Sequence, residues 1–265
     1  MMADITGETR IVGLVADPVG HLKGFREFNA RFARLGAPVV MMPAHVRAGK
    51  LREFILGARQ LSNLQGLIVS LPHKRTVIDH IDAVSTDAAE IGAVNAIRRQ
   101  DDGTLFGDNF DGKGLVRAML ADRIMPEDRQ VLLLGAGGAG RAIGFALAGA
   151  GAAMLGIHDL DAGRATSLAD SLRDRLGPVA AVVDVPEATG FDMVVNATPL
   201  GLADDDPSPL TLSTLRSEHI VVDIVNRPET RLIAAARALD CVTQLGNAMM
   251  AAQVSEVADF LLGRS

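Results

Sequence analysis

The chain's 265 residues, of which 48% are hydrophobic and 22% charged, are enough to form one large hydrophobic core or two smaller ones. The net charge of −6 is spread along the sequence without a basic stripe, which disfavours nucleic acid, and the uncharged stretch at residues 142–157 is too short to span a membrane. No secretory signal is visible at the start, and the single cysteine, Cys241, excludes an internal disulfide and favours the reducing cytoplasm.

The first block of the sequence alternates between strand and helix patterns. Short apolar runs predict three strands, at residues 10–16, 38–42 and 66–71. Amphipathic patterns predict two helices between them, at residues 25–35 and 51–60. A further helix is expected at 85–91, followed by a hairpin of strands 94–99 and 104–106 that turns at Asp101, Asp102 and Gly103. This order is typical of an α/β fold.

The second block opens with a predicted helix at residues 112–121 and continues with strands that alternate with further helical segments. Apolar runs predict five strands, at 131–134, 153–158, 179–183, 193–196 and 220–225. Residues 203–209, with three aspartates and two prolines, predict a loop that can move, and residues 248–262 predict a final helix. The block therefore has the strand and helix order of a parallel α/β sheet.

A glycine-rich turn follows the strand at 131–134. Gly135, Gly137 and Gly140 have the spacing G-x-G-x-x-G, and residues 142–150, which are apolar or glycine, predict a helix packed against the strand. Gly135 would permit the tight turn, Gly137 the approach of a phosphate, and Gly140 close packing of helix on strand. The start of the helix would offer N–H donors to the anion, so the turn predicts a dinucleotide site.

An acidic residue stands where such a site needs one. Asp159 ends the next apolar strand, 24 residues after Gly135, and a carboxylate there binds the ribose hydroxyls of NAD and repels the additional phosphate of NADP. The alternative is that Asp159 caps a helix that begins near Asp161. We expect NAD to be preferred over NADP.

Six motifs in order along the chain resemble those of the shikimate dehydrogenase family, together with Gln253 in the last helix. They are GLVADPVGH at 13–21, VSLPHK at 69–74, IGAVN at 91–95, NFDG at 109–112, GAGGA at 135–139 and NATPLG at 196–201. The resemblance covers nearly the whole chain. It implies a substrate-binding α/β domain of residues 1–109 with 244–265, to which the C-terminal helix returns, and a Rossmann NAD(P)-binding domain of residues 110–243.

The same resemblance assigns the catalytic pair. Lys74 matches the family's catalytic lysine and Asp111 its partner aspartate. Oxidation of an alcohol needs a base within hydrogen-bond reach of the hydroxyl, and a lysine can serve when desolvation favours its neutral form. Without the family, Lys74 reads as a surface lysine near a helix start. Asp111 would orient the lysine and hold a second hydroxyl.

Further positions carry over from the resemblance. Ser70, Asn95 and Gln253 match residues that contact the substrate, although Asn95 also fits a turn residue and Gln253 a residue on the solvent face of a helix. The residues that the resemblance places at the cofactor are Gly135, Ala136, Gly137, Gly138, Ala139, Gly140, Asp159, Leu160, Asn196, Thr198, Pro199 and Gly246. His21 and His73 belong to the motifs, but no spacing in the sequence predicts a metal site.

The substrate pocket departs from the family pattern. Leu22 and Gly24 replace two serines that hold the substrate carboxylate, Ile68 replaces an asparagine and Asn226 a tyrosine, while Asp159-Leu160-Asp161 replaces the Asn-Arg-Thr that receives the phosphate of NADP. Lys23 could supply a new charge for an anionic substrate, or be a solvated surface residue.

These departures lead to a functional expectation. We expect an NAD-dependent dehydrogenase of a small cyclic alcohol or hydroxy acid other than shikimate, acting as a monomer or homodimer in the cytoplasm with no nucleic-acid or membrane partner. One alternative is a true shikimate or quinate dehydrogenase with a rebuilt carboxylate site. Another is a catalytically silent NAD-binding regulator, against which the retention of Lys74 and Asp111 argues.

Overall fold

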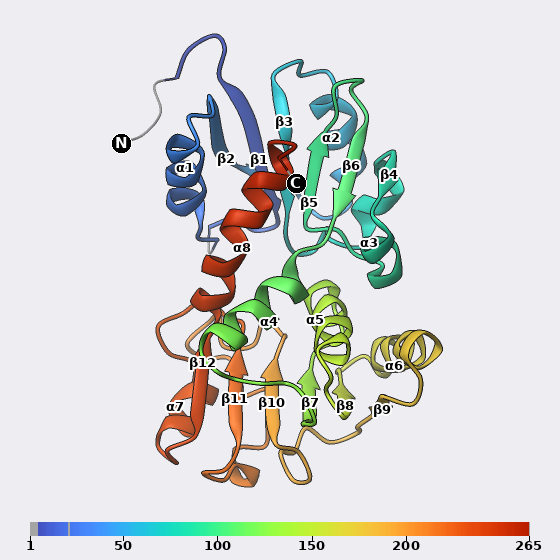
Figure 1. The fold of residues 1–265 in the computed structure, drawn as a ribbon, viewed down its shortest axis with the longest axis vertical. Helices are drawn as coiled ribbons and strands as arrows, with labels where there is room; N and C mark the ends of the chain where they lie inside the picture. The colour runs from blue at the N-terminus through green and yellow to red at the C-terminus, as the bar shows by residue number, and fades with distance from the viewer. Residues whose placement is uncertain (1–4, 21, 265) are drawn as a thin grey trace. The chain divides into compact units, whose positions relative to one another are not determined.

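The computed structural model describes residues 5–20 and 22–264, so the predicted motif residue His21 lies outside the described residues. The chain divides into two compact units. Unit 1 comprises residues 1–110 and 253–265, and unit 2 comprises residues 111–252. The long helix α8 (Gly246–Leu261) begins in unit 2 and ends in unit 1 (Figure 1).

Unit 1 is built on a mixed six-stranded sheet with the order β2-β1-β3-β5-β6-β4. Its strands are β1 (Arg10–Ala16), β2 (Val39–His45), β3 (Leu64–Val69), β4 (Ala83–Val84), β5 (Ala96–Arg99) and β6 (Leu105–Asp108). The strands β1, β2 and β3 run parallel, whereas β5 pairs antiparallel with both β3 and β6. The predicted hairpin is therefore present as β5 and β6.

Helices cover the sheet of unit 1 with two hydrophobic clusters. Phe28 and Phe32, one turn apart on α1 (Phe25–Arg34), pack with Val257 and Phe260 of α8 in the first cluster. Leu51 and Ile55 of α2 (Leu51–Ala58) belong to the second cluster. Two short helices complete the unit, the 3₁₀ helix η1 (Thr76–His80) and α3 (Thr86–Ile91).

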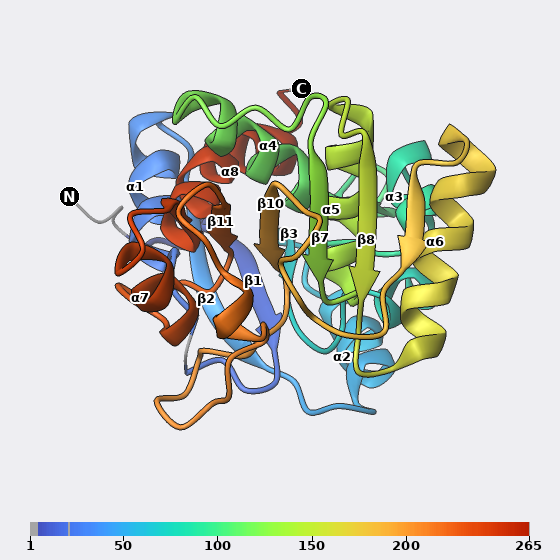
Figure 2. The same ribbon diagram turned by 90° about the horizontal axis from the view of Figure 1, so that it is seen from below.

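Unit 2 is a parallel six-stranded sheet with the order β12-β11-β10-β7-β8-β9 (Figure 1). Figure 2 shows four of its strands, β11, β10, β7 and β8, side by side. Its strands are β7 (Gln130–Leu134), β8 (Met154–His158), β9 (Ala180–Val182), β10 (Met193–Asn196), β11 (Ile220–Asp223) and β12 (Val242–Leu245). The connecting helices are α4 (Asp111–Ala121), α5 (Gly138–Gly149), α6 (Ala162–Leu176), the 3₁₀ helix η2 (Leu212–Thr214) and α7 (Arg231–Arg237).

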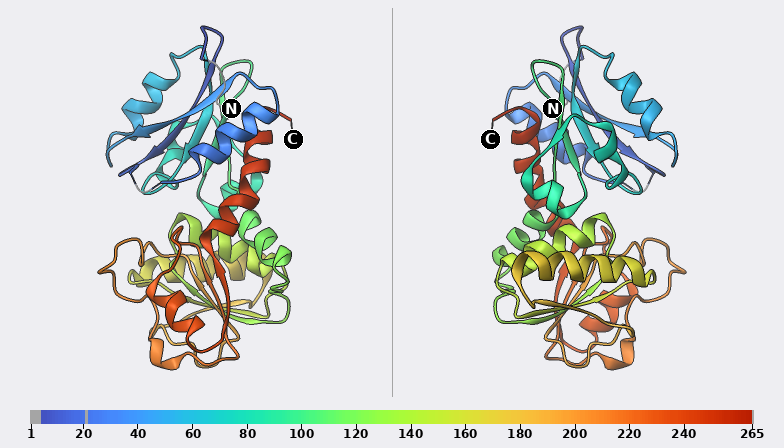
Figure 3. Two further views of the ribbon diagram at one scale, coloured as in Figure 1. Left: turned by 90° about the vertical axis from the view of Figure 1, so that its left-hand side faces the viewer. Right: turned by 90° about the vertical axis from the view of Figure 1, so that its right-hand side faces the viewer.

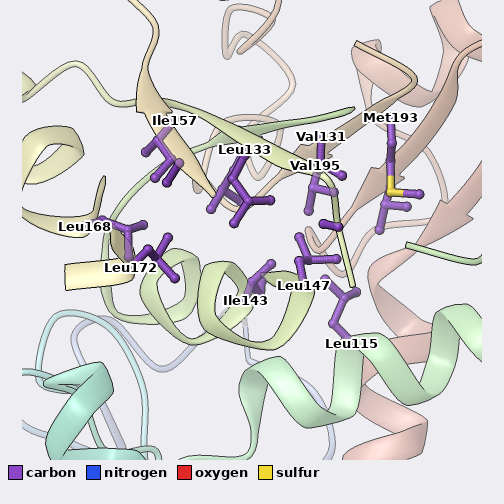
Figure 4. Packing of buried hydrophobic residues seen from close by; sticks show 14 of the residues in the cluster. Leu115, Val131, Leu133, Ile143, Leu147, Ile157, Leu168, Leu172, Met193 and Val195 are labelled. Carbon is purple, nitrogen blue, oxygen red and sulfur yellow. The ribbon is translucent and has the colours of Figure 1, made fainter. Parts of the chain in front are cut away.

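The sheet of unit 2 is covered on both faces, as a strand of consecutive apolar residues requires. The α5 and α6 helices lie on one side and α7 on the other (Figure 3). Figure 4 shows Leu133 of β7, Ile143 and Leu147 of α5 and Leu168 of α6 packed together in the hydrophobic core between the sheet and the helices α5 and α6. The predicted α/β fold with a Rossmann unit is confirmed.

Some elements differ from the sequence-based expectation. The helix α8 begins at Gly246, two residues before the predicted start, and the seven-residue helix α7 was not predicted. The segment 203–209 contains no helix or strand, as expected for a loop. Among the described residues, no helix is both long and apolar enough to cross a bilayer.

Candidate functional site

The turn between β7 and α5 requires glycine at two positions. Gly135 adopts a φ of 97°, a left-handed conformation that side chains rarely adopt, and its N–H donates to the carbonyl oxygen of His158 at 2.7 Å. A Cβ on Gly140 would overlap the carbonyl oxygen of Gly135. The glycines thus let the helix begin directly against the turn.

Gly137 differs from its two neighbours in the motif. A Cβ built on it meets nothing within 4 Å, and its φ is −72°, so glycine is not needed there for the fold. The helix α5 begins immediately afterwards with Gly138, Ala139 and Gly140, whose N–H groups belong to the first turn. Open space beside a helix N-terminus fits a dinucleotide pyrophosphate, which needs close backbone approach and N–H donors.

Asp159 follows β8 and contacts the glycine-rich turn. Its Oδ2 accepts a hydrogen bond from the N–H of Ala136 at 2.7 Å, and its Oδ1 accepts one from the N–H of Asp161 at 2.9 Å. The N-cap of α6 is Asp161, whose carboxylate accepts from the N–H groups of Gly163 and Arg164. Asp159 is therefore not the cap of that helix. A carboxylate has about four acceptor positions, so Asp159 retains capacity for ribose hydroxyls.

The remaining predicted cofactor residues lie at the carboxyl ends of neighbouring strands or next to them. Leu160 follows Asp159 and is 92% exposed. Thr198 and Pro199 follow Asn196, the last residue of β10, and a Cβ on Gly135 would come within 3.0 Å of Thr198 Cγ2. Gly246 follows β12, where a Cβ would overlap the carbonyl oxygen of Ile224. In an open α/β sheet this edge is where ligands bind.

In unit 1, Lys74 stands on a well-anchored turn after β3. Ser70 N–H donates to the carbonyl oxygen of Val15 at 2.8 Å, and the Lys74 carbonyl accepts from the N–H of Val94 at 2.8 Å. The ring of His73 is buried, with Nε2 2.7 Å from the carbonyl oxygen of Val46. Lys74 itself is half-buried. The turn therefore presents the lysine from a fixed backbone.

Asn95 and Gln253 both hold the backbone of Phe110, although they are distant in sequence. Asn95 Oδ1 accepts a hydrogen bond from the Phe110 N–H at 3.0 Å, and Gln253 Nε2 donates to the Phe110 carbonyl oxygen at 3.2 Å. Asp111 comes next and is the buried first residue of α4. Lys74 belongs to unit 1 and Asp111 to unit 2.

The residues that depart from the family pattern have structural partners of their own. Leu22 and Ile68 pack against the first hydrophobic cluster of unit 1. Gly24, the N-cap of α1, has a φ of 98°. Lys23, between Leu22 and Gly24, is exposed. Asn226 donates from Nδ2 to Met250 Sδ at 3.2 Å.

Sequence reasoning missed the contacts that order the loop after Pro199. Asp206 Oδ2 accepts from the N–H groups of Gly201 and Ala203, both at 2.9 Å, and these bonds lower the pKa of its carboxyl group. Arg227 donates to the carbonyl oxygen of Leu202 at 2.9 Å and pairs with Asp204. The three aspartates of the loop were the available signal, because two of them make these contacts.

Sequence reasoning also missed a buried carboxylate in unit 2. Asp223, the last residue of β11, is only 1% exposed and accepts hydrogen bonds from Asn196, Val225 and Thr230. An acidic residue directly after the apolar run at 220–222 was a visible signal, since such residues end strands at the ligand edge of an α/β sheet.

Comparison with known proteins gives consistent matches. The model of the shikimate dehydrogenase substrate binding domain matches residues 14–97. A shikimate dehydrogenase (NADP(+)) of Rubrobacter xylanophilus is 38% identical over 88% of this chain and 84% of its own, and one of Geobacter sp. is 37% identical over 94% and 88%. A solved Listeria monocytogenes shikimate 5-dehydrogenase, in complex with shikimate and NAD, has a TM-score of 0.87 at 28% identity, covering 99% of this chain and 95% of that chain.

Proposed function

The chain belongs to the shikimate dehydrogenase family, and from that premise we propose that it catalyses the reversible oxidation of shikimate by a nicotinamide dinucleotide. Its class, an NAD(P)-dependent oxidoreductase acting on a ring alcohol, follows from the family. The observation that best supports shikimate as the substrate is the 38% identity to a shikimate dehydrogenase over 88% of the chain.

The expectation of a substrate other than shikimate is wrong. It rested on a few pocket positions, whereas relatives at 37% and 38% identity over most of the chain are shikimate dehydrogenases. Leu22 and Ile68, two of those positions, both pack against the hydrophobic cluster of unit 1. The same relatives argue against the alternative of a catalytically silent regulator.

The proposed division of labour follows the two units. Unit 1 binds the substrate and unit 2 the dinucleotide, through the turn at 135–140 and Asp159, Asn196, Thr198 and Gly246. The open space at Gly137 and the donors at the start of α5 support that assignment. When bound, the nicotinamide supplies the hydride acceptor for the alcohol carbon.

Residues of the chain itself transfer the proton of the reacting hydroxyl group. We assign Lys74 to take the proton from the reacting hydroxyl and to return it in the reverse direction, with Asp111 orienting the lysine and holding a neighbouring hydroxyl. The anchored turn from Ser70 to Lys74 supports this role, because a base on a fixed backbone stays within reach of the hydroxyl. Asn95 and Gln253, which hold Phe110, contact the other hydroxyl groups in this proposal.

We assign NAD as the preferred dinucleotide. Asp159 and Asp161 place two carboxylates at the start of α6, and Leu160 offers no charge. The relatives named as NADP(+) enzymes show that the family also uses NADP. A 2′-phosphate beside these carboxylates would be repelled, whereas ribose hydroxyls can donate to Asp159.

We assign Lys23 to bind the carboxylate of the substrate. Its exposure at the start of α1 and its position between Leu22 and Gly24 support that role. The proposed enzyme acts in the cytoplasm as a monomer or homodimer.

The direct test measures kcat/KM for shikimate with NAD and with NADP, with quinate as the comparison substrate. We expect shikimate turnover in the ordinary enzyme range, about 10⁴ M⁻¹s⁻¹ or above. Turnover of shikimate more than a hundredfold below that of another ring alcohol would overturn the substrate assignment.

A further inference from the structure

Asp223 is a buried titratable group that the proposed reaction does not use. Its Oδ1 accepts hydrogen bonds from Asn196 Nδ2 at 2.9 Å and from the N–H of Val225 at 3.0 Å, and its Oδ2 accepts one from Thr230 Oγ1 at 2.6 Å. Burial raises the pKa of this carboxyl group. Burying a carboxylate costs free energy unless hydrogen bonds offset it. The partners of Asp223 therefore indicate what the residue does.

The carboxylate sets the orientation of the Asn196 amide. A carboxylate accepts but does not donate, so the amide must turn its Nδ2 toward β11. Asn196 Oδ1 then faces Thr198 and accepts from both its N–H at 3.0 Å and its Oγ1 at 2.7 Å. Thr198 Oγ1 in turn accepts from the N–H of Leu200 at 3.2 Å. One buried group thereby orders the backbone of residues 196–200.

This backbone forms one wall of the glycine-rich turn. A Cβ on Gly135 would come within 3.0 Å of both the Ala197 carbonyl carbon and Thr198 Cγ2, and Ala197 N–H donates to the carbonyl oxygen of Leu134 at 2.7 Å. Thr230 acts at the far end of the same segment, since a Cβ on Gly201 would come within 3.1 Å of Thr230 Cγ2. A shift of residues 197–201 would therefore change the conformation of the glycine-rich turn.

We propose that Asp223 and Thr230 are positioning residues for the dinucleotide: through Asn196 they fix residues 196–201 against Gly135 and so hold the turn in the conformation that binds. The inference rests on the proposed function, because it takes the turn at 135–140 as the dinucleotide site. It assigns neither residue a contact with the dinucleotide.

The test measures the Kd for NADH by its own fluorescence, together with the Kd for NADPH, in the full-length protein. The variants are Asp223→Leu, Asp223→Asn and Thr230→Val. Thr214→Val is the matched control, because Thr214 also lies in unit 2, donates to the Thr211 carbonyl oxygen and accepts from the Ala188 N–H, away from the turn. All measurements are made where circular dichroism shows the variants folded.

We expect Asp223→Leu to weaken NADH binding by more than about tenfold and Thr230→Val by about three- to tenfold, as for loss of one or more hydrogen bonds. Asp223→Asn keeps an acceptor oxygen for Asn196 and should bind within about threefold of wild type. Thr214→Val should lose stability but retain wild-type affinity. In turnover, the KM for the dinucleotide should rise while the KM for shikimate stays within about twofold.

Three outcomes would overturn the proposal: wild-type affinity in Asp223→Leu or Thr230→Val, an equal loss of affinity in Thr214→Val, or a loss in Asp223→Asn as large as in Asp223→Leu. Failure of the wild-type chain to bind either dinucleotide would instead overturn the proposed function, and this inference with it.

Discussion

Asp159 Oδ2 accepts a hydrogen bond of 2.7 Å from the N–H of Ala136, which joins the end of β8 to the glycine-rich turn after β7. The carboxylate that we assign to the ribose is thus held by the same turn that we assign to the pyrophosphate. A carboxylate oriented in this way recognises hydroxyl groups at little entropic cost. In this assignment, the choice of dinucleotide and the geometry of the turn are coupled.

Cofactor choice gives the first prediction. The wild-type chain should favour NAD over NADP by about tenfold to a hundredfold in kcat/KM, the scale of a charge-assisted hydrogen bond of roughly 1 to 3 kcal/mol. Asp159→Asn removes the charge but keeps an oxygen that can accept from Ala136, so it should raise kcat/KM with NADP. Equal or better efficiency of the wild-type chain with NADP would refute the assignment.

A pair of glycine variants separates binding from folding. Gly137→Ala adds a methyl group that meets no protein atom within 4 Å, so its free energy of unfolding should change by less than about 0.5 kcal/mol while dinucleotide binding weakens. Gly140→Ala places its methyl group on the carbonyl oxygen of Gly135 and should cost several kcal/mol of stability. Circular dichroism in urea suits this measurement, since the chain has no Trp or Tyr. If Gly137→Ala bound NADH as tightly as wild type, the phosphate would not lie at this glycine.

The role of Lys74 predicts a specific kinetic loss. Lys74→Ala should lower kcat about 10²- to 10⁴-fold, the range for a positioned acid or base, while the Kd for NAD stays nearly unchanged. Asp111→Asn should show a related loss, and the double variant should lose less than the product of the two. Lys50→Ala is the control, because Lys50 is an exposed lysine of unit 1 whose Nζ pairs with Glu53 at 2.8 Å. Retention of most of the kcat in Lys74→Ala would reduce this residue to a structural role.

Lys23 predicts a smaller effect on substrate binding. Lys23→Gln should raise the KM for shikimate by about 1.5- to fivefold with kcat unchanged, because exposed ion pairs are typically worth about 0.2 to 1 kcal/mol. The effect should shrink at high salt, which screens exposed charges. A KM that does not respond to this substitution at low ionic strength would place the carboxylate elsewhere.

Asp223 predicts a pH dependence of stability. Because burial raises its pKa above the ordinary value of 3.8, stability is lost as the pH rises from that value through the raised pKa, and the loss persists at neutral pH. Its three donors, from Asn196, Val225 and Thr230, are neutral groups. Asn cannot ionise, so Asp223→Asn should unfold at a higher urea concentration than wild type at pH 7, with the difference shrinking toward pH 4. A variant that is less stable by the same amount at both pH values would contradict this sign.

Local patterns were sufficient to predict much of the fold. The apolar run of β7, the glycines that follow it and the hairpin of β5 and β6 each depend on neighbouring residues, so the sequence displays them directly. The helix α7 escaped prediction because seven residues give too few turns for a clear periodicity.

Contacts of the site that join residues far apart in the sequence could not be predicted. Asn95 and Gln253 meet at the backbone of Phe110, and Asp223 on β11 bonds to Asn196 on the neighbouring strand β10. Neither arrangement leaves a trace in local spacing. The substrate was misjudged because Leu22 and Ile68 were read one position at a time, without the packing that accommodates them.

The return of the last helix also affects the order in which the two units can complete their folding during synthesis. Val257 and Phe260 of α8 pack with Phe28 and Phe32 in unit 1, although all of unit 2 lies between them in the chain. While the chain grows on the ribosome, unit 2 has its full set of residues before unit 1 has received the helix segment that closes its core. Residues 1–110 of unit 1 therefore keep part of their apolar surface uncovered until the end of α8 has been synthesised.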